Sequence, residues 1–339
     1  MSKGIRFASI LLGLSILCTS LLAAGTANPY VGRWALTIPG GGAGWLGVTQ
    51  ENGYLDASVL WGGGSVLPVD CVFMVENELY VIRLSKVERK DAAGKVVRTQ
   101  TFPEVLRAEL DGDTLQLTQT LVRRNGSGID ERQFTGQRIP PLPPKPDLAK
   151  VKYGKPIVLF DGKSLDAWKL LGSARNGWSI EEGVLVNKPI QPEGRGQRHI
   201  SYGNLRTVAE FEDFNLKLEV KVAKGENSGV YLRGIYEVQV CDSYNRPLDS
   251  HNMGGIYSRI TPTVNAEKPP GEWQTMDLTL VDRHATVILN GKTIIDNQPL
   301  LGCTGGALWA DESKPGPIYL QGDHTGINYR NIVLTPVVQ

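Results

Sequence analysis

The stretch that decides the fold runs from Asn227 to Ser243 and reads NSGVYLRGIYEVQVCDS. In its first half Val230 and Leu232 point to one side, and Tyr231 and Arg233 point to the other. The second half resumes the alternation after a glycine turn. A period of two is typical of strands that are buried on one face only. The stretch therefore predicts a β-hairpin with one apolar face and one polar face.

The polar face of this hairpin carries side chains that can bind a polar ligand. Glu237 and Gln239 fall on it, and a second segment, GPIYLQGDH at 316–324, alternates in the same way with Tyr319 and Gln321. Carboxylates and amides bond sugar hydroxyls, and aromatic rings pack against sugar C–H groups. An ordinary solvated sheet face explains either strand alone. Two strands with the same set of residues favour a binding site.

The beginning of the chain predicts export. Lys3 and Arg6 precede an apolar run over 10–22 and small residues over 23–27, which is the pattern of a signal peptide covering residues 1–27. The run is too short for a membrane span. We therefore expect no membrane span and a periplasmic or extracellular location.

Charge and cysteine content narrow the classes of partner. The chain of 339 residues has 36 Lys and Arg against 35 Asp and Glu, and loss of Lys3 and Arg6 leaves a net charge of −1. A near-neutral protein is a poor match for nucleic acid. Cys71, Cys241 and Cys303 would remain after export, and a Cys241–Cys303 disulfide and free buried thiols both stay open. The scattered histidines give no zinc spacing.

Two β-rich domains are predicted. Residues 28–138 are turn-rich and strand-like, and a small antiparallel β-barrel would close their sheet edges; the opening Gly32-Arg33-Trp34 is similar to lipocalin-like barrels. The proline-rich segment 139–152 predicts an extended, semi-rigid linker. Residues 153–339 alternate strands with turns, including a hairpin at Asn290-Gly291, and predict an all-β jelly-roll sandwich.

Many separated segments of the second domain match one family. They are LFDGKSLDAW (159–168), WSIEEGVL (178–185), FEDFNLKLEV (211–220), NSGVYLRG (227–234), YEVQVCDS (236–243), GGIYS (254–258), GEWQ (271–274), LNGK (289–292) and GPIYLQGDH with YRNI (316–332). Over residues 155–336 the chain resembles the 3-keto-disaccharide hydrolase family, formerly a domain of unknown function. The resemblance implies a concanavalin A-like jelly roll that acts on sugars oxidised to a ketone at C3.

A C3 ketone acidifies the proton on C2, so a base can remove it and the glycosidic oxygen can leave from C1. Hydration of the enone then gives net hydrolysis. We assign Glu237 or His324 as the base and Arg233, or a divalent cation, as the group that stabilises the enolate. No cofactor is otherwise predicted. The expected sugar-binding residues are Tyr231, Gln239, Tyr319, Gln321, Asp242, Tyr257 and His199.

Two other functions remain open at this stage. A retaining glycosidase needs two carboxylates about 5–5.5 Å apart, and no second carboxylate follows Glu237 on its own strand face. A non-catalytic carbohydrate-binding module is the alternative from another class, because a fold does not fix a function. Arg233 and Glu237 could also form a simple cross-strand ion pair.

Overall fold

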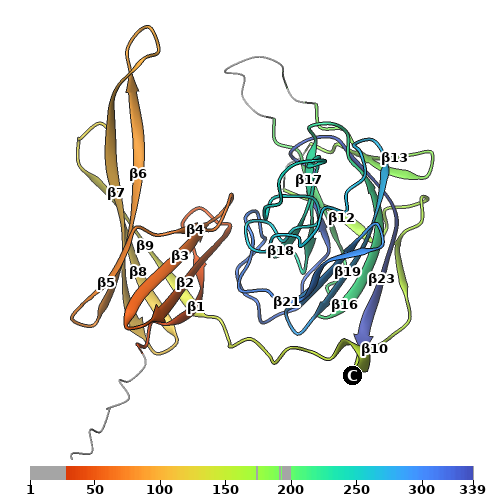
Figure 1. Cartoon of the computed structure of the whole chain (residues 1–339), viewed down its shortest axis with the longest axis horizontal. Helices are drawn as coiled ribbons and strands as arrows, with labels where there is room; N and C mark the ends of the chain where they lie inside the picture. Colours follow the sequence, from red (N-terminus) through yellow and green to blue (C-terminus); the bar gives the residue numbers. More distant parts are fainter. Residues whose placement is uncertain (1–27, 173–174, 191, 193–199, 339) are drawn as a thin grey trace, which may run out of the picture.

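The computed structural model describes residues 28–338 except 173–174, 191 and 193–199, and Figure 1 shows two β-rich bodies joined by a long connection. The strands of the first body are β1 Gly32–Thr37, β2 Ala43–Glu51, β3 Tyr54–Trp61, β4 Leu67–Pro68, β5 Cys71–Val75, β6 Glu78–Lys90, β7 Val96–Asp111, β8 Thr114–Val122 and β9 Ile129–Arg138. The predicted signal peptide, residues 1–27, lies outside the described residues.

The first nine strands form one curled antiparallel sheet in the order β4-β3-β2-β1-β9-β8-β7-β6-β5. Its two ends, β4 and β5, are consecutive in the chain. The segment between them bridges the opening, since the amide of Val69 donates to Ala57 on β3 and that of Asp70 to Ile82 on β6. Trp34, among others, fills the interior. The curled sheet confirms the predicted small antiparallel barrel, and β6 and β7 extend beyond it as a long hairpin (Figure 1).

The connection to the second body is extended, with a single 3₁₀ turn, η1 Leu148–Lys150. The connection also forms hydrogen bonds with the second domain. The carbonyls of Pro140 and Pro141 accept hydrogen bonds from Arg283, and that of Pro146 accepts one from Asn297 at 2.9 Å. The proline-rich segment is therefore fixed along the second domain.

The second body is a two-sheet sandwich. Its strands are β10 Lys152–Tyr153, β11 Ile157–Phe160, β12 Trp168–Leu171, β13 Trp178–Glu181, β14 Val184–Asn187, β15 Asn204–Thr207, β16 Phe214–Lys221, β17 Asn227–Leu232, β18 Tyr236–Cys241, β19 Trp273–Val281, β20 His284–Leu289, β21 Lys292–Pro299, β22 Tyr319–Leu320 and β23 Ile327–Val338. One sheet has the order β13-β14-β23-β16-β19-β20-β21, with β10 and β11 also paired to β23, and the other has the order β12-β15-β22-β17-β18. This is the predicted jelly-roll sandwich.

The hairpin of β17 and β18 follows the alternation in its sequence. Val230 and Val238 pair across the strands and join the hydrophobic core between the sheets, while Tyr231 and Glu237 pair on the opposite face. β17 ends at Leu232, and the next two residues adopt positive φ angles in the turn. The Asn290-Gly291 turn likewise joins β20 to β21, with both residues at positive φ.

The barrel and the sandwich share a packed interface. Trp45 and Leu60 of the barrel belong to the same core cluster as the sandwich residues, and the guanidinium of Arg259 lies 4.4 Å from the centre of the Trp45 ring.

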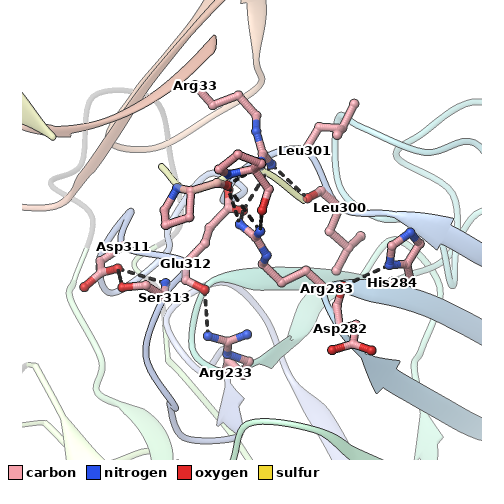
Figure 2. A network of polar contacts seen from close by, with 12 residues as sticks. Arg33, Arg233, Asp282, Arg283, His284, Leu300, Leu301, Asp311, Glu312 and Ser313 are labelled. Atoms are coloured by element: carbon pink, nitrogen blue, oxygen red, sulfur yellow. Dashed lines mark hydrogen bonds and ion pairs between the residues drawn. The ribbon is translucent and has the colours of Figure 1, made fainter. Parts of the chain in front are cut away.

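Figure 2 shows a polar contact at this interface, where the buried carboxylate of Glu312 meets Arg33 of the barrel and Arg283 of the sandwich, each at 3.3 Å. We call these three residues the interdomain ion cluster. Together with the shared core, it fixes the barrel against the sandwich.

Candidate functional site

A cavity of about 230 Å³ opens on the polar face of the β17–β18 hairpin. It gathers six of the residues that the sequence assigned to the site, which are Tyr231, Glu237, Tyr257, Tyr319, Gln321 and His324. They come from β17, β18 and β22 and from two loops. The strand alternation brings them together because neighbouring strands of one sheet present their outward residues to the same side.

Glu237 is a buried acid of the cavity with a strongly raised pKa. Its side chain is 4% exposed, and its carboxyl lies over Gly229, where a Cβ atom would come within 2.2 Å of Oε1. Burial raises the pKa of Glu237 to about 8, the nearby charge of Asp323 adds to this shift, and a hydrogen bond from Tyr231 opposes it. Glu237 is thus mainly protonated at neutral pH, so it can donate a proton.

Tyr231 connects Glu237 to the backbone. Its hydroxyl lies 2.8 Å from Oε2 of Glu237 and 2.8 Å from the carbonyl of Gly305. A phenol has a single hydrogen, and the carbonyl can only accept. The phenol hydrogen can therefore be donated to only one of these two oxygens at a time, and Glu237 accepts it when it is ionised. The ring stacks on Tyr319 with centroids 4.3 Å apart, which fixes its orientation.

Asp323 and His324 form a second titratable pair in the cavity. Nδ1 of His324 lies 2.9 Å from Oδ1 of Asp323, and this contact raises the pKa of His324 above its ordinary value. A carboxylate on one ring nitrogen orients the imidazole and leaves the other nitrogen for a ligand. The pair is therefore suited to accept a proton from a bound molecule.

Two amide side chains of the cavity carry buried oxygens. Oδ1 of Asn227 and Oε1 of Gln321 have no hydrogen-bond partner among the described residues. Buried polar groups are normally paired. Both residues line the cavity, so its wall contains two acceptors without a partner in the part of the chain that the structure describes.

Arg233 does not reach this cavity, contrary to the prediction that it stabilises an enolate there. It lies in the turn after β17 with a φ of 55°, so the alternation of the strand no longer sets its direction. Its guanidinium donates to the carbonyl oxygen of Glu312 (Figure 2) and also to that of Lys314. Arg233 supports the loop that carries Glu312, and it makes no ion pair with Glu237.

Two further predicted residues, Gln239 and Asp242, also fall elsewhere. Gln239 is buried beside Glu237 on β18 but does not line the cavity. Asp242 lies past the end of β18, where its carboxylate accepts the amide of Gly225 at 2.9 Å. His199 lies outside the described residues.

The predictions about cysteines and metal ions can be compared with the structure only for the described residues. Within them Cys71, Cys241 and Cys303 are free thiols, so the Cys241–Cys303 disulfide alternative is wrong for this structure. Among the same residues no group of three or more His, Cys, Asp or Glu side chains is arranged to hold a metal ion, and no helix is long and apolar enough to cross a membrane.

Sequence reasoning missed part of the cavity. The predicted site residues do not include Asp323, which the structure makes the second carboxylate of the pocket, beside His324. The buried amide of Asn227 was not singled out either. Gly63 and Gly64 of the barrel also line the cavity. No local pattern marks these two glycines, because only the packing of the barrel against the sandwich brings them there.

The fold and the cavity define a jelly-roll protein with a polar cavity on one of its two sheets. The chain belongs to the family of 3-keto-alpha-glucoside-1,2-lyase-like domains, whose model matches residues 155–335. The barrel lies outside that match.

A curated relative, the 3-keto-disaccharide hydrolase of Bacteroides thetaiotaomicron, is 30% identical over an alignment that covers 34% of this chain and 49% of the relative. The chain thus spans about half the length of that relative. Two solved Parabacteroides distasonis proteins of proposed glycosyl hydrolase activity are 31% and 21% identical, cover 58% and 54% of this chain and 93% and 94% of their own, and have TM-scores of 0.44 and 0.42.

Proposed function

We propose that the protein cleaves the glycosidic bond of 3-keto-glycosides. Family membership and the name of the curated relative support action on such sugars. The observation that carries the proposal is the buried carboxyl of Glu237, with a pKa raised to about 8, in one cavity with the Asp323–His324 pair. An acid and a base held in separate environments are what proton abstraction with loss of a leaving group requires.

In the proposed reaction, His324 removes the proton from C2 and the electrons form an enolate at the C3 oxygen. The enolate collapses to an enone as the C1–O bond breaks, and Glu237 gives its proton to the departing oxygen. Water then adds to C1 and loses a proton to Glu237, while His324 returns the first proton to C2. Both residues end in their initial states, and the net reaction is hydrolysis.

The remaining cavity residues would hold the sugar. Asn227 and Gln321 would accept hydroxyl hydrogens. The almost fully buried Tyr231 and Tyr319 would shape the wall of the cavity. With Arg233 outside the cavity, stabilisation of the enolate falls to hydrogen-bond donors such as the Gln321 amide and the Tyr257 hydroxyl.

A conventional glycosidase is the second candidate, because the cavity contains two carboxyl groups, Glu237 and Asp323. In that case Glu237 would be the acid, and Asp323 the nucleophile or base. The two candidates differ in what they demand of the substrate, since only elimination needs the C3 ketone.

One experiment separates the candidates. The protein is incubated with a nitrophenyl 3-keto-glucoside and with the parent nitrophenyl glucoside, and release of nitrophenol is followed. We expect release from the keto sugar alone. Equal release from both would favour the conventional glycosidase, and binding of the keto sugar without release would indicate a carbohydrate-binding module.

We also propose that the protein is exported, on the basis of the signal-peptide pattern over residues 1–27. Expression of the full chain in a Gram-negative host should give a shortened protein in the periplasmic fraction. Full-length protein confined to the cytoplasmic fraction would contradict export.

A further inference from the structure

We propose that the glycine-rich loop Gly62–Val66 of the barrel is a specificity element that limits the cavity to a single sugar ring. This inference rests on the proposed function, and it deepens it by naming the part of the chain that sets the size of the substrate. The loop connects β3 to β4. It lies outside residues 155–335, so the wall is supplied by a part of the chain that the family match does not include.

The loop is held against the sandwich by contacts at several positions. The amide of Gly306 donates to the carbonyl of Gly62 at 3.1 Å. Oγ of Ser65 lies 3.0 Å from Nε2 of His251, and the amide of Val66 donates to Oγ of Ser258 at 2.8 Å. The position of the loop is therefore determined by the second domain.

The loop also supports the catalytic carboxyl group through the chain segment beside it. A Cβ atom at Gly305 would lie 2.0 Å from the carbonyl oxygen of Gly64, so the two backbones are in direct contact. The carbonyl of Gly305 in turn bonds the hydroxyl of Tyr231, which bonds Glu237. The loop is thus linked to Glu237 through Gly305 and Tyr231.

The size of the cavity gives the consequence for the substrate. Its volume of about 230 Å³ is below the range of roughly 300–1,000 Å³ that is usual for drug-sized ligands. Such a space fits one ring and leaves the leaving group outside. With Gly63 and Gly64 forming one wall, the enzyme would take a terminal 3-keto sugar and would not bind an internal unit of a long chain.

Gly63 offers a clean substitution. A Cβ atom there meets no other atom within 4 Å, and no positive φ is required at this position. We therefore compare Gly63→Ala and Gly63→Trp with the control Ser127→Trp, which adds the same indole to an exposed turn between β8 and β9. Thermal unfolding of each full-length variant shows whether it folds like the wild type.

The expected result is graded by size. Gly63→Trp should raise KM for a nitrophenyl 3-keto-glucoside by about 10–100-fold, as expected when a tight site is overpacked, with a smaller change in kcat. Gly63→Ala should change KM by less than about threefold, and Ser127→Trp should behave as the wild type. A purely structural role of the loop would lower the unfolding temperature instead of raising KM.

The outcomes separate this inference from the proposed function. If the wild type cleaves the keto sugar and Gly63→Trp has an unchanged KM, the loop is not a wall of the site and the inference fails alone. If the wild type binds 3-keto-glucose by calorimetry without cleaving the glucoside, and Gly63→Trp loses that binding, the inference stands and the proposed function fails. If the wild type neither binds nor cleaves, both fail.

Discussion

Two buried carboxyl groups, Glu237 and Glu312, differ in the charged groups that surround them. They are 4% and 2% exposed, and burial is the first cause that raises the pKa of each. Glu312 faces Arg33 and Arg283, whose charges oppose that shift. Glu237 faces a neutral phenol and the carboxylate of Asp323, which adds to it.

This difference suits Glu312 to a structural role and Glu237 to proton transfer. A buried carboxylate between two guanidinium groups is neutralised and geometrically fixed, as in the interdomain ion cluster (Figure 2). A buried carboxyl without a cation keeps its proton and can release it when a substrate brings an acceptor. The same substitution, Glu to Gln, should therefore have opposite consequences at the two positions.

The largest expected effect is that of Glu237→Gln on turnover. Loss of a general acid should lower kcat for a 3-keto-glucoside by about 10²–10⁴-fold. Stability at pH 7 should change little, because the amide replaces a group that is already mainly neutral. Steady-state kinetics and chemical denaturation of the variant check both statements, and full activity would remove Glu237 from the mechanism.

Glu312→Gln should instead affect stability. It removes the carboxylate that Arg33 and Arg283 share at the domain interface, and breaking a buried ion pair costs about 3–5 kcal/mol. Denaturant unfolding measures this loss, and kcat per folded molecule should stay near that of the wild type.

Glu219→Gln is the matched control for Glu312→Gln. It breaks a more exposed pair with Arg330 and should cost no more than about 1 kcal/mol. Equal losses in the two variants would show that the interdomain ion cluster has no special role.

The smallest expected effect is a shift in the pH profile. Because the pKa of Glu237 is raised to about 8, the acid is lost as pH rises through that value, and kcat/KM should fall above about pH 8. On the acidic side of the profile, kcat/KM should increase with pH as His324 loses its proton. The midpoint of this increase should lie above the ordinary pKa of histidine, because the pKa of His324 is raised.

Tyr231→Phe sharpens this prediction. The variant removes the hydrogen bond that lowers the pKa of Glu237, so the falling limb should move to higher pH. A limb that stays in place in this variant, measured with the same substrate, would assign it to another group.

Much of the fold could be predicted from the sequence, because strand alternation and turn residues are local signals. The period of two in β17 and β18 placed Tyr231 and Glu237 on one face, as observed. The same reasoning failed for Arg233. Its parity matched Tyr231, but a positive φ in the turn redirected the side chain, and the sequence alone gave no sign of the carbonyl groups that it would meet.

The amino-acid sequence by itself determined two all-β domains, a proline-rich connection between them and the polar face of one sheet. These depend on hydrophobic periodicity and on backbone preferences of single residues, which act over a few positions. Only the tertiary structure decided which acid pairs with arginine, which acid keeps its proton, and that Gly63 and Gly64 of the barrel line a cavity of the sandwich. Desolvation and charge depend on neighbours that are distant in the chain, so packing had to specify them.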